Sequence, residues 1–248
     1  MHDDPGGTER TQSGVEMGGE HSALPRAGDL VAAASLLALL PLRRLHPQSA
    51  AAGRATLFFP LIGLFIGAVL AAANWAVAGR LPPWLAALLL VAVWEGLGRG
   101  EPLRACAASR PAHLPGPLLM LGIVFTKATC LAVTTGLRPA ALLFAPTLAR
   151  WAMVVLAVGA REAQHPGRKF NGAITFHQFA WTSVFSFAVV FVTAEALGII
   201  VVVCTAAMTL GLRLLFHHRA GGVSWDMLLA GGACIETCVL ALFALLGT

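Results

Sequence analysis

Charged side chains inside long apolar runs are the residues of this sequence that most clearly suggest chemistry. Lys127 lies in Phe-Thr-Lys-Ala, Arg150 lies in Ala-Arg-Trp, and Glu236 lies in the last apolar run. Ionisable groups at membrane depth are costly, so they pair with one another, face a protein interior or serve a function. We expect these three residues to line a functional interior. Glu95 lies near the end of its own apolar run, where we expect it to pair or to reach the interface.

Two polar stretches between apolar runs suggest a site for a phosphorylated substrate. They are Ser109-Arg110 and the stretch Gly221-Gly222-Val223-Ser224-Trp225-Asp226. The glycine pair permits a close backbone approach before a helix, and Asp226 at that helix's start is either an N-cap or a metal ligand. Carboxylates beside arginines are typical of sites in which Mg²⁺ bridges phosphate oxygens while arginine neutralises their charge.

The elements that must position these residues are predicted to be membrane helices. Of the 248 residues, 57% are hydrophobic and 12% are charged, which leaves too few polar groups to cover a soluble globule. This composition excludes a soluble enzyme, a disordered regulator and a nucleic-acid-binding module. The predicted fold class is all-α: a polytopic membrane bundle of about seven transmembrane helices with a short half-helix near the start.

The boundaries follow from the apolar runs. Residues 1–27 are predicted to be a disordered polar tail and residues 28–248 a single integral-membrane helical domain. The half-helix is expected near Asp29–Leu42. The seven spans are expected at about Ala55–Val77, Trp84–Leu97, Gly116–Thr135, Ala140–Gly159, two within Phe179–Phe216 divided at Glu195–Gly198, and Met227–Gly247.

The basic residues predict the orientation. Eleven Lys and Arg residues fall on one side of the predicted membrane, and two, Arg80 and Arg138, fall on the other. Positive charge gathers on the cytoplasmic side of an inner membrane, so we expect a cytoplasmic amino terminus and an external carboxyl terminus. We also expect Asp226, Arg110 and Glu101 to converge with Glu236 at one cytoplasmic pocket, above Lys127 and Arg150.

The five cysteines predict no disulfide framework, because they are odd in number and four lie in apolar runs. Cys234 and Cys238 are one helical turn apart, and we favour packing over a metal pair for them.

Five motifs in order resemble the cobalamin synthase family, adenosylcobinamide-GDP ribazoletransferase. Arg54 precedes Phe58-Phe59-Pro60-Leu61-Ile62-Gly63, and Leu36–Pro41 is similar to the family's Leu-Thr-Arg-Leu-Pro. Ser109-Arg110 with Gly116 and Lys127 resembles its Ser-Arg-Ile-Gly-x-x-Gly and following span. The remaining likenesses are Ala145-Pro146 with Ala149-Arg150-Trp151-Ala152-Met153-Val154, and Gly221–Asp226 with the trailing acid Glu236.

The resemblance implies an activity and the residues that carry it. The family transfers the adenosylcobinamide phosphate group from adenosylcobinamide-GDP to α-ribazole or its 5′-phosphate and releases GMP. Its implied cofactor is Mg²⁺. Carried over by motif, the catalytic residues are Arg110, Lys127 and Arg150, the substrate-binding residues are Ser109, Gly221, Gly222 and Arg54, and the metal ligands are Glu101, Asp226 and Glu236.

The stretch after the second span departs from the family's pattern. The family has an acid-rich Gly-Leu-His-Leu-Asp-Gly-Leu-Ala-Asp-Thr-Ala-Asp there, whereas residues 95–106 read Glu-Gly-Leu-Gly-Arg-Gly-Glu-Pro-Leu-Arg-Ala-Cys. Glu101 replaces one of the acids, while Arg99 and Arg104 make the stretch cationic. A cationic stretch can bind a diphosphate directly but holds a divalent metal poorly.

Two other functions remain open at this point. A relative without catalysis would bind a corrinoid or assemble with other cobalamin-synthesis enzymes, and the missing acids favour that alternative. A small transporter is the third alternative. Two observations argue against it: charge gathers at one face rather than along a path across the membrane, and no inverted repeat appears in the sequence. The expected partners are the corrinoid nucleotide, the nucleoside substrate and membrane lipid, with no nucleic acid.

Overall fold

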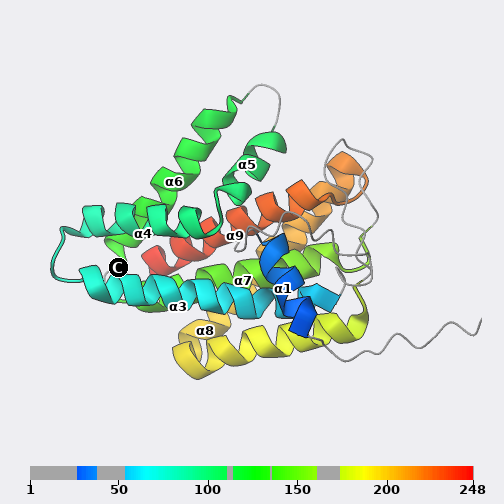
Figure 1. The fold of residues 1–248 in the computed structure, drawn as a ribbon, viewed down its shortest axis with the longest axis horizontal. Helices are drawn as coiled ribbons and strands as arrows, with labels where there is room; N and C mark the ends of the chain where they lie inside the picture. Colours follow the sequence, from blue (N-terminus) through cyan, green and yellow to red (C-terminus); the bar gives the residue numbers. More distant parts are fainter. Residues whose placement is uncertain (1–26, 38–53, 111–113, 135, 161–173, 248) are drawn as a thin grey trace, which may run out of the picture.

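A computed structural model describes residues 27–37, 54–110, 114–134, 136–160 and 174–247. Each element within those ranges is helical, which confirms the all-α fold class (Figure 1). The predicted polar tail lies almost wholly outside the described residues, as do the loop cations Arg43, Arg44, Arg161, Arg168 and Lys169. The elements are α1 (Ala27–Leu36), the 3₁₀ turn η1 (Thr56–Phe58), α3 (Phe59–Val77), α4 (Pro83–Leu97), α5 (Glu101–Ala108), α6 (Gly116–Val133), α7 (Arg138–Ala157), α8 (Phe176–Ala220) and α9 (Trp225–Leu246).

All seven predicted spans are helical, although their lengths differ. In the described part of the chain, five helical segments are long and apolar enough to cross a membrane. They are Thr56–Val77, Gly116–Val133, Arg138–Ala157, Leu197–Ala220 and Trp225–Leu246. Pro83–Leu97 and Phe176–Val192 are apolar but shorter. The chain is therefore a multi-pass membrane protein, and the count of seven crossings stays a prediction.

Helix α8 joins two predicted spans in one continuous element. Its 45 residues would extend about 67 Å if straight, more than twice the hydrocarbon thickness of a bilayer. Figure 1 instead shows α8 changing direction between its yellow first part and its orange last part. The two apolar segments, Phe176–Val192 and Leu197–Ala220, meet at the predicted division, but no loop separates them.

The helices begin where the sequence supplies start signals. Pro occupies the first or second position of α3, α4, α5, α6 and α7, where its missing N–H costs nothing. Helix α8 begins with a capping box formed by Thr175 and Gln178, and it ends at Gly221, whose φ is +67°. These signals fix the boundaries of the elements that carry the site.

Helix α7 is the centre of the bundle, since 17 of its 20 residues are buried. Helix α3 packs closely along it because Gly63 and Gly67 leave its surface flat. A Cβ added at Gly63 would lie 2.5 Å from the carbonyl oxygen of Pro146, and one at Gly67 would lie 2.8 Å from Cα of Leu143. Close helix contact through small residues four apart is a usual packing device in membranes.

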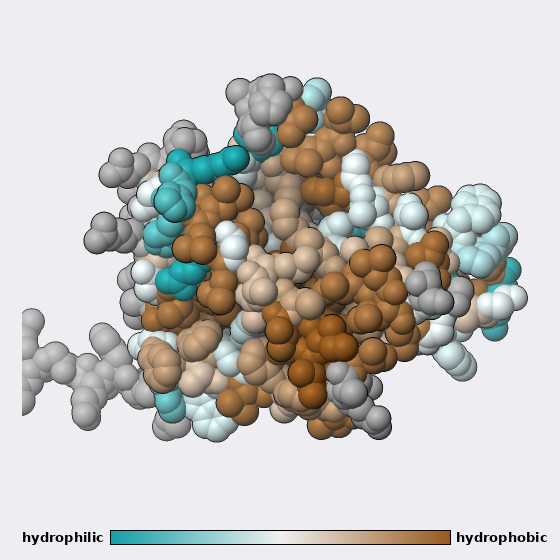
Figure 2. Space-filling view, turned by 180° about the vertical axis from the view of Figure 1, so that it is seen from behind, coloured by the Kyte–Doolittle hydropathy of each residue, from teal (hydrophilic) through white to brown (hydrophobic). Residues whose placement is uncertain are grey.

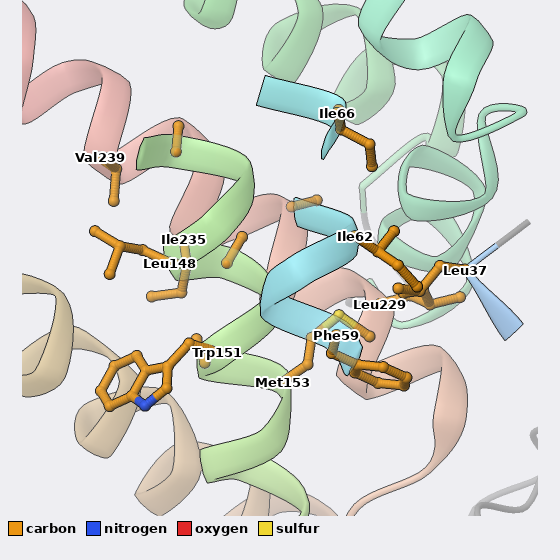
Figure 3. Packing of buried hydrophobic residues seen from close by; sticks show 14 of the residues in the cluster. Leu37, Phe59, Ile62, Ile66, Leu148, Trp151, Met153, Leu229, Ile235 and Val239 are labelled. Atoms are coloured by element: carbon orange, nitrogen blue, oxygen red, sulfur yellow. The ribbon is translucent and has the colours of Figure 1, made fainter. Parts of the chain in front are cut away.

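Helix α9 covers another side of α7, and the hydrophobic core runs between α3, α7 and α9. Figure 3 shows Phe59 and Ile62 of α3, Met153 of α7, and Leu229 of α9 among its members. Figure 2 shows hydrophobic surface over most of the middle of the molecule, with hydrophilic residues gathered mainly toward its two ends. This distribution fits a bundle whose sides face lipid.

Several arginines cap helix ends with their guanidinium groups. Arg138 donates to the carbonyl oxygens of Leu131 at 2.8 Å and Thr134 at 3.2 Å, at the end of α6. Arg213 of α8 donates to those of Val155 at 2.8 Å and Val158 at 2.6 Å, at the end of α7. Unpaired terminal carbonyls are costly in lipid, so these arginines have a structural role in addition to any effect on topology.

Candidate functional site

Four charged side chains from four helices form one buried chain of ion pairs. Lys127 Nζ of α6 lies 2.8 Å from Glu95 Oε1 of α4 and 2.6 Å from Glu236 Oε2 of α9. The other oxygen of Glu236 lies 2.6 Å from an Nη atom of Arg150 on α7. The Lys127 ammonium also lies 4.7 Å from the centre of the Trp94 ring. We call Glu95, Lys127, Glu236 and Arg150 the buried quartet.

The buried quartet is neutral overall, which explains how four charges are tolerated among apolar helices. Lys127 and Glu236 are at most 1% exposed, whereas the Glu95 side chain is 14% exposed. Both oxygens of Glu236 bind cations, so this carboxylate is not placed to ligate a metal as well. The predicted pairing of Glu95 is confirmed, but its partner Lys127 was not foreseen from the sequence.

Asp226 lies in the first turn of α9 but is not its N-cap. Ser224 holds that position, and its hydroxyl accepts a hydrogen bond from the Met227 backbone N–H at 3.3 Å. The N-cap interpretation of Asp226 is therefore wrong, because the helix begins two residues earlier than an Asp226 cap would require. Asp226 is half-buried and is separated from Ala230 by one helical turn.

Helix α5 lies between the second and third predicted spans, where the apolar runs predict no helix. Cys106 Sγ lies 3.7 Å from the carbonyl oxygen of Ala230, so α5 packs on the face of α9 that also carries Asp226. The neighbouring Cys234 side chain and burial raise the pKa of the Cys106 thiol well above its usual range. Glu101 opens α5, in a helix rather than in a loop.

The carboxyl end of α5 carries Ser109 and Arg110. Ser109 is the C-cap and is exposed. The Arg110 guanidinium donates to the carbonyl oxygens of Ala107 and Leu114. It thereby ties the end of α5 to the residues before α6. Arg110 is exposed, so the side chain combines this bracing role with access from outside the bundle.

The remaining predicted binding residues lie at the beginnings of α3 and α9. Arg54 Nε pairs with Asp29 Oδ2 at 3.2 Å, which fastens α1 to the start of the bundle. The rings of Phe59 and Trp225 lie 6.3 Å apart, so α3 and α9 begin side by side. Gly221 is exposed and Gly222 is buried, in the turn between α8 and α9.

Several of the predicted site residues lie on elements that contact one another. Helix α5 contacts α6 and α9, and the starts of α3 and α9 meet. Glu236 lies at a different level from Asp226, because it follows ten residues later on α9, a rise of about 15 Å. Lys127 and Arg150 lie at the depth of Glu236, beneath the region that carries Asp226. Whether Asp226, Arg110 and Glu101 share one pocket stays a prediction.

The carboxylates that the sequence predicts as Mg²⁺ ligands do not form one three-ligand set. Glu236 is bound by two cations and lies a long way down α9 from Asp226. Among the residues that the structure describes, no group of three or more His, Cys, Asp or Glu could hold a metal ion. Glu101 and Asp226 each have an interaction of their own. This donor set does not fit a protein-held Mg²⁺ at the three predicted positions.

The fold and the site define a polytopic membrane helix bundle with a basic, glycine-containing polar region above a buried chain of ion pairs. Residues 29–101 and 116–246 match the family described as cobalamin-5-phosphate synthase. The chain belongs to this family, and the resemblance found in its motifs is confirmed.

Curated relatives bear the family's activity in their names. A protein of Geotalea daltonii, adenosylcobinamide-GDP ribazoletransferase, is 29% identical over 79% of this chain and 88% of that protein. Proteins of the same name from Pseudomonas paraeruginosa and Pseudomonas aeruginosa are each 31% identical over 84% of this chain and 92% of the relative. No solved structure is significantly similar to this chain.

Proposed function

We propose that this protein transfers the adenosylcobinamide phosphate group from adenosylcobinamide-GDP to α-ribazole or its 5′-phosphate. The observation that carries the proposal is the family match, which runs from α1 to the end of α9 with one gap. The gap, residues 102–115, covers most of α5 and the residues before α6. The chain therefore differs most from its family on the element that packs against Asp226's helix.

The reaction requires one bond to form and one to break. An oxygen of the nucleoside attacks the phosphorus that carries the cobinamide, and the bond from that phosphorus to the bridging oxygen of GMP breaks. The nucleoside hydroxyl loses its proton, and the negative charge passes to the leaving GMP. A protein assists such a step by positioning the reactants and by stabilising phosphate charge.

We assign these tasks to the region around the end of α5 and the start of α9. The Asp226 carboxylate is half-buried there, and we propose that it orients and deprotonates the attacking hydroxyl. Ser109, Arg110, Gly221 and Gly222 are the proposed substrate contacts. Lys127 and Arg150 are bound to acids within the buried quartet, so we propose that they position helices rather than touch substrate.

We further propose that the active region faces the cytoplasm of a bacterial inner membrane. The basic residues on that side, eleven against two, support this orientation. An amphiphilic corrinoid held at the lipid boundary would there meet a polar nucleoside from the cytoplasm.

The deciding experiment is an assay of the full chain purified in detergent. Adenosylcobinamide-GDP is supplied with α-ribazole or with its 5′-phosphate, and the corrinoid product and GMP are quantified by mass spectrometry. We expect equal amounts of GMP and product from wild type and a loss of at least 100-fold in Asp226→Asn. A folded wild-type protein that releases no GMP with either nucleoside would overturn the proposal.

A further inference from the structure

The turn between α4 and α5 lies partway along the length of α9. Glu95, two residues before the end of α4, is joined through Lys127 to Glu236. Glu236 lies eleven residues after Trp225, the first residue of α9, and this separation is about 16 Å of a helix about 33 Å long. Figure 1 shows α4 ending and α5 beginning alongside the middle part of α9. α4 therefore ends below the level at which α9 begins.

From that turn, α5 leads back toward the start of α9. Cys106 contacts the carbonyl of Ala230, which lies five residues after Trp225, a rise of about 7.5 Å. Arg99 and Arg104 lie between Glu95 and Cys106 in the chain. Their backbones are thus placed between two levels that are both below the beginning of α9.

Arg99 and Arg104 are exposed, and neither takes part in an ion pair in the described part of the chain. Neither guanidinium makes a hydrogen bond like those that hold Arg110, Arg138 and Arg213 at helix ends. Arg99 also has a φ of +53°, the one positive value for a non-glycine residue within the described ranges. Both side chains are consequently available to a ligand.

Unpaired guanidinium groups are costly against lipid but stable against water or an anion. Broken helices at membrane depth occur where they line a water-filled cavity. Glu95 and Glu236 are bound by Lys127 and Arg150, so they cannot neutralise the arginines. Glu101, which opens α5 between the two arginines, forms an ion pair with neither of them. Two free guanidinium groups match the paired oxygens of phosphates.

We propose that Arg99 and Arg104 line a water-accessible inlet at the α4–α5 turn and bind a diphosphate directly, without a divalent metal held by protein carboxylates. The identity of the diphosphate as part of the substrate rests on the proposed function. The binding itself rests on the two free arginines and on the occupied carboxylates. In this site the two arginines neutralise the negative charge of the diphosphate, a task that a divalent metal performs in other phosphate sites.

Inorganic pyrophosphate is a suitable probe because it carries the charge without the corrinoid. Binding to the purified full chain in detergent is measured by calorimetry with EDTA and then with added Mg²⁺. We expect binding in EDTA, and a Kd about tenfold or more higher in Arg99→Gln or Arg104→Gln, which is the loss of one charge-assisted hydrogen bond. Arg219→Gln is the matched control, since Arg219 is an exposed arginine at the end of α8.

Three results would overturn the proposal. The first is pyrophosphate binding that occurs only when Mg²⁺ is present, and the second is a Kd in the Arg99→Gln/Arg104→Gln double variant equal to that of wild type. The third is a rise in Kd in Arg219→Gln as large as that in the Arg99 and Arg104 variants. Glu101→Gln gives a second test that leaves the arginines intact. A metal site would lose pyrophosphate binding with that carboxylate, whereas an arginine site keeps it. Size-exclusion profiles and thermal melting of each variant confirm that it is folded.

The outcome is separable from that of the proposed function. Pyrophosphate binding in EDTA without any GMP release would leave the arginine site standing and overturn the reaction. GMP release that requires Mg²⁺ and is unaffected by Arg99→Gln and Arg104→Gln would leave the reaction standing and overturn the arginine site.

Discussion

At the scale of single residues, the contrast is between charges that are held and charges that are free. Lys127, Arg150 and Glu236 are bound to one another at 2.6 Å contacts or through a shared partner, while Arg99 and Arg104 are exposed and unpaired. The sequence marks all of them as ionisable groups in an apolar chain. It does not reveal which charges pair with each other, because the partners of Lys127 lie 32 and 109 residues away.

The first prediction concerns the buried quartet. Glu236→Gln leaves Lys127 and Arg150 with one fewer buried counter-charge, and removing one partner of a buried ion pair costs about 3–5 kcal/mol. We expect that loss in the free energy of unfolding, measured by SDS titration in mixed micelles. Glu95→Gln should cost less, because the Glu95 side chain is 14% exposed. Equal unfolding midpoints for wild type and Glu236→Gln would show that the quartet contributes no stability.

The second prediction separates the cap of α9 from its acid. Ser224→Ala removes the hydroxyl that accepts from the Met227 N–H, and loss of such a cap costs about 1 kcal/mol of stability. Asp226→Asn should change stability by less than about 1 kcal/mol, the usual size of a helix-dipole effect, yet abolish GMP release. Stability and turnover are measured on the same preparations. An Asp226→Asn variant that is stable and releases GMP as fast as wild type would show that Asp226 has no catalytic role.

At the scale of elements, the sequence predicts what depends on local hydropathy and misses what depends on packing. The seven apolar runs all became helices, since each run's composition favours a membrane helix on its own. Helix α5 was not predicted, because its eight residues are too short and too polar for that criterion. Its placement is decided by Cys106 against Ala230 and by Gly116, where a Cβ would lie 3.2 Å from that of Ala107.

The third prediction tests the close contact of α3 with α7. Gly63→Ala places a methyl group 2.5 Å from the Pro146 carbonyl oxygen, so the helices must separate, and overpacking of this kind costs about 1–3 kcal/mol. Gly122→Ala is the matched control, because nothing lies within 4 Å of its added Cβ. That control should be stabilised by up to about 1 kcal/mol through helix propensity. Similar unfolding free energies for the two variants would contradict the packing argument.

At the scale of the whole molecule, the basic side of the bundle serves two purposes. Some of its arginines complete helix ends, as Arg213 does for α7 and Arg110 for α5. Others, Arg99 and Arg104, remain free near the turn where α4 stops. Charge counting from the sequence treats these residues alike and so predicts orientation without predicting a site. The hydrogen bonds in the structure distinguish the two kinds of arginine. The topology depends on whether two short apolar helices, Pro83–Leu97 and Phe176–Val192, cross the membrane.

The last prediction is the membrane path of those two helices. Helix α4 has 15 residues, or about 22 Å, and Phe176–Val192 has 17 residues, or about 26 Å, against a hydrocarbon core of about 30 Å. We expect both to cross, because the charge alternation requires it. Fusions of alkaline phosphatase and of a fluorescent protein, made after Arg80, Gly159 and Thr248, report the side of each position. We expect outside, cytoplasm and outside. A Gly159 fusion that reports outside would mean that α4 does not cross. With Gly159 in the cytoplasm, a cytoplasmic Thr248 would mean the same for the first part of α8.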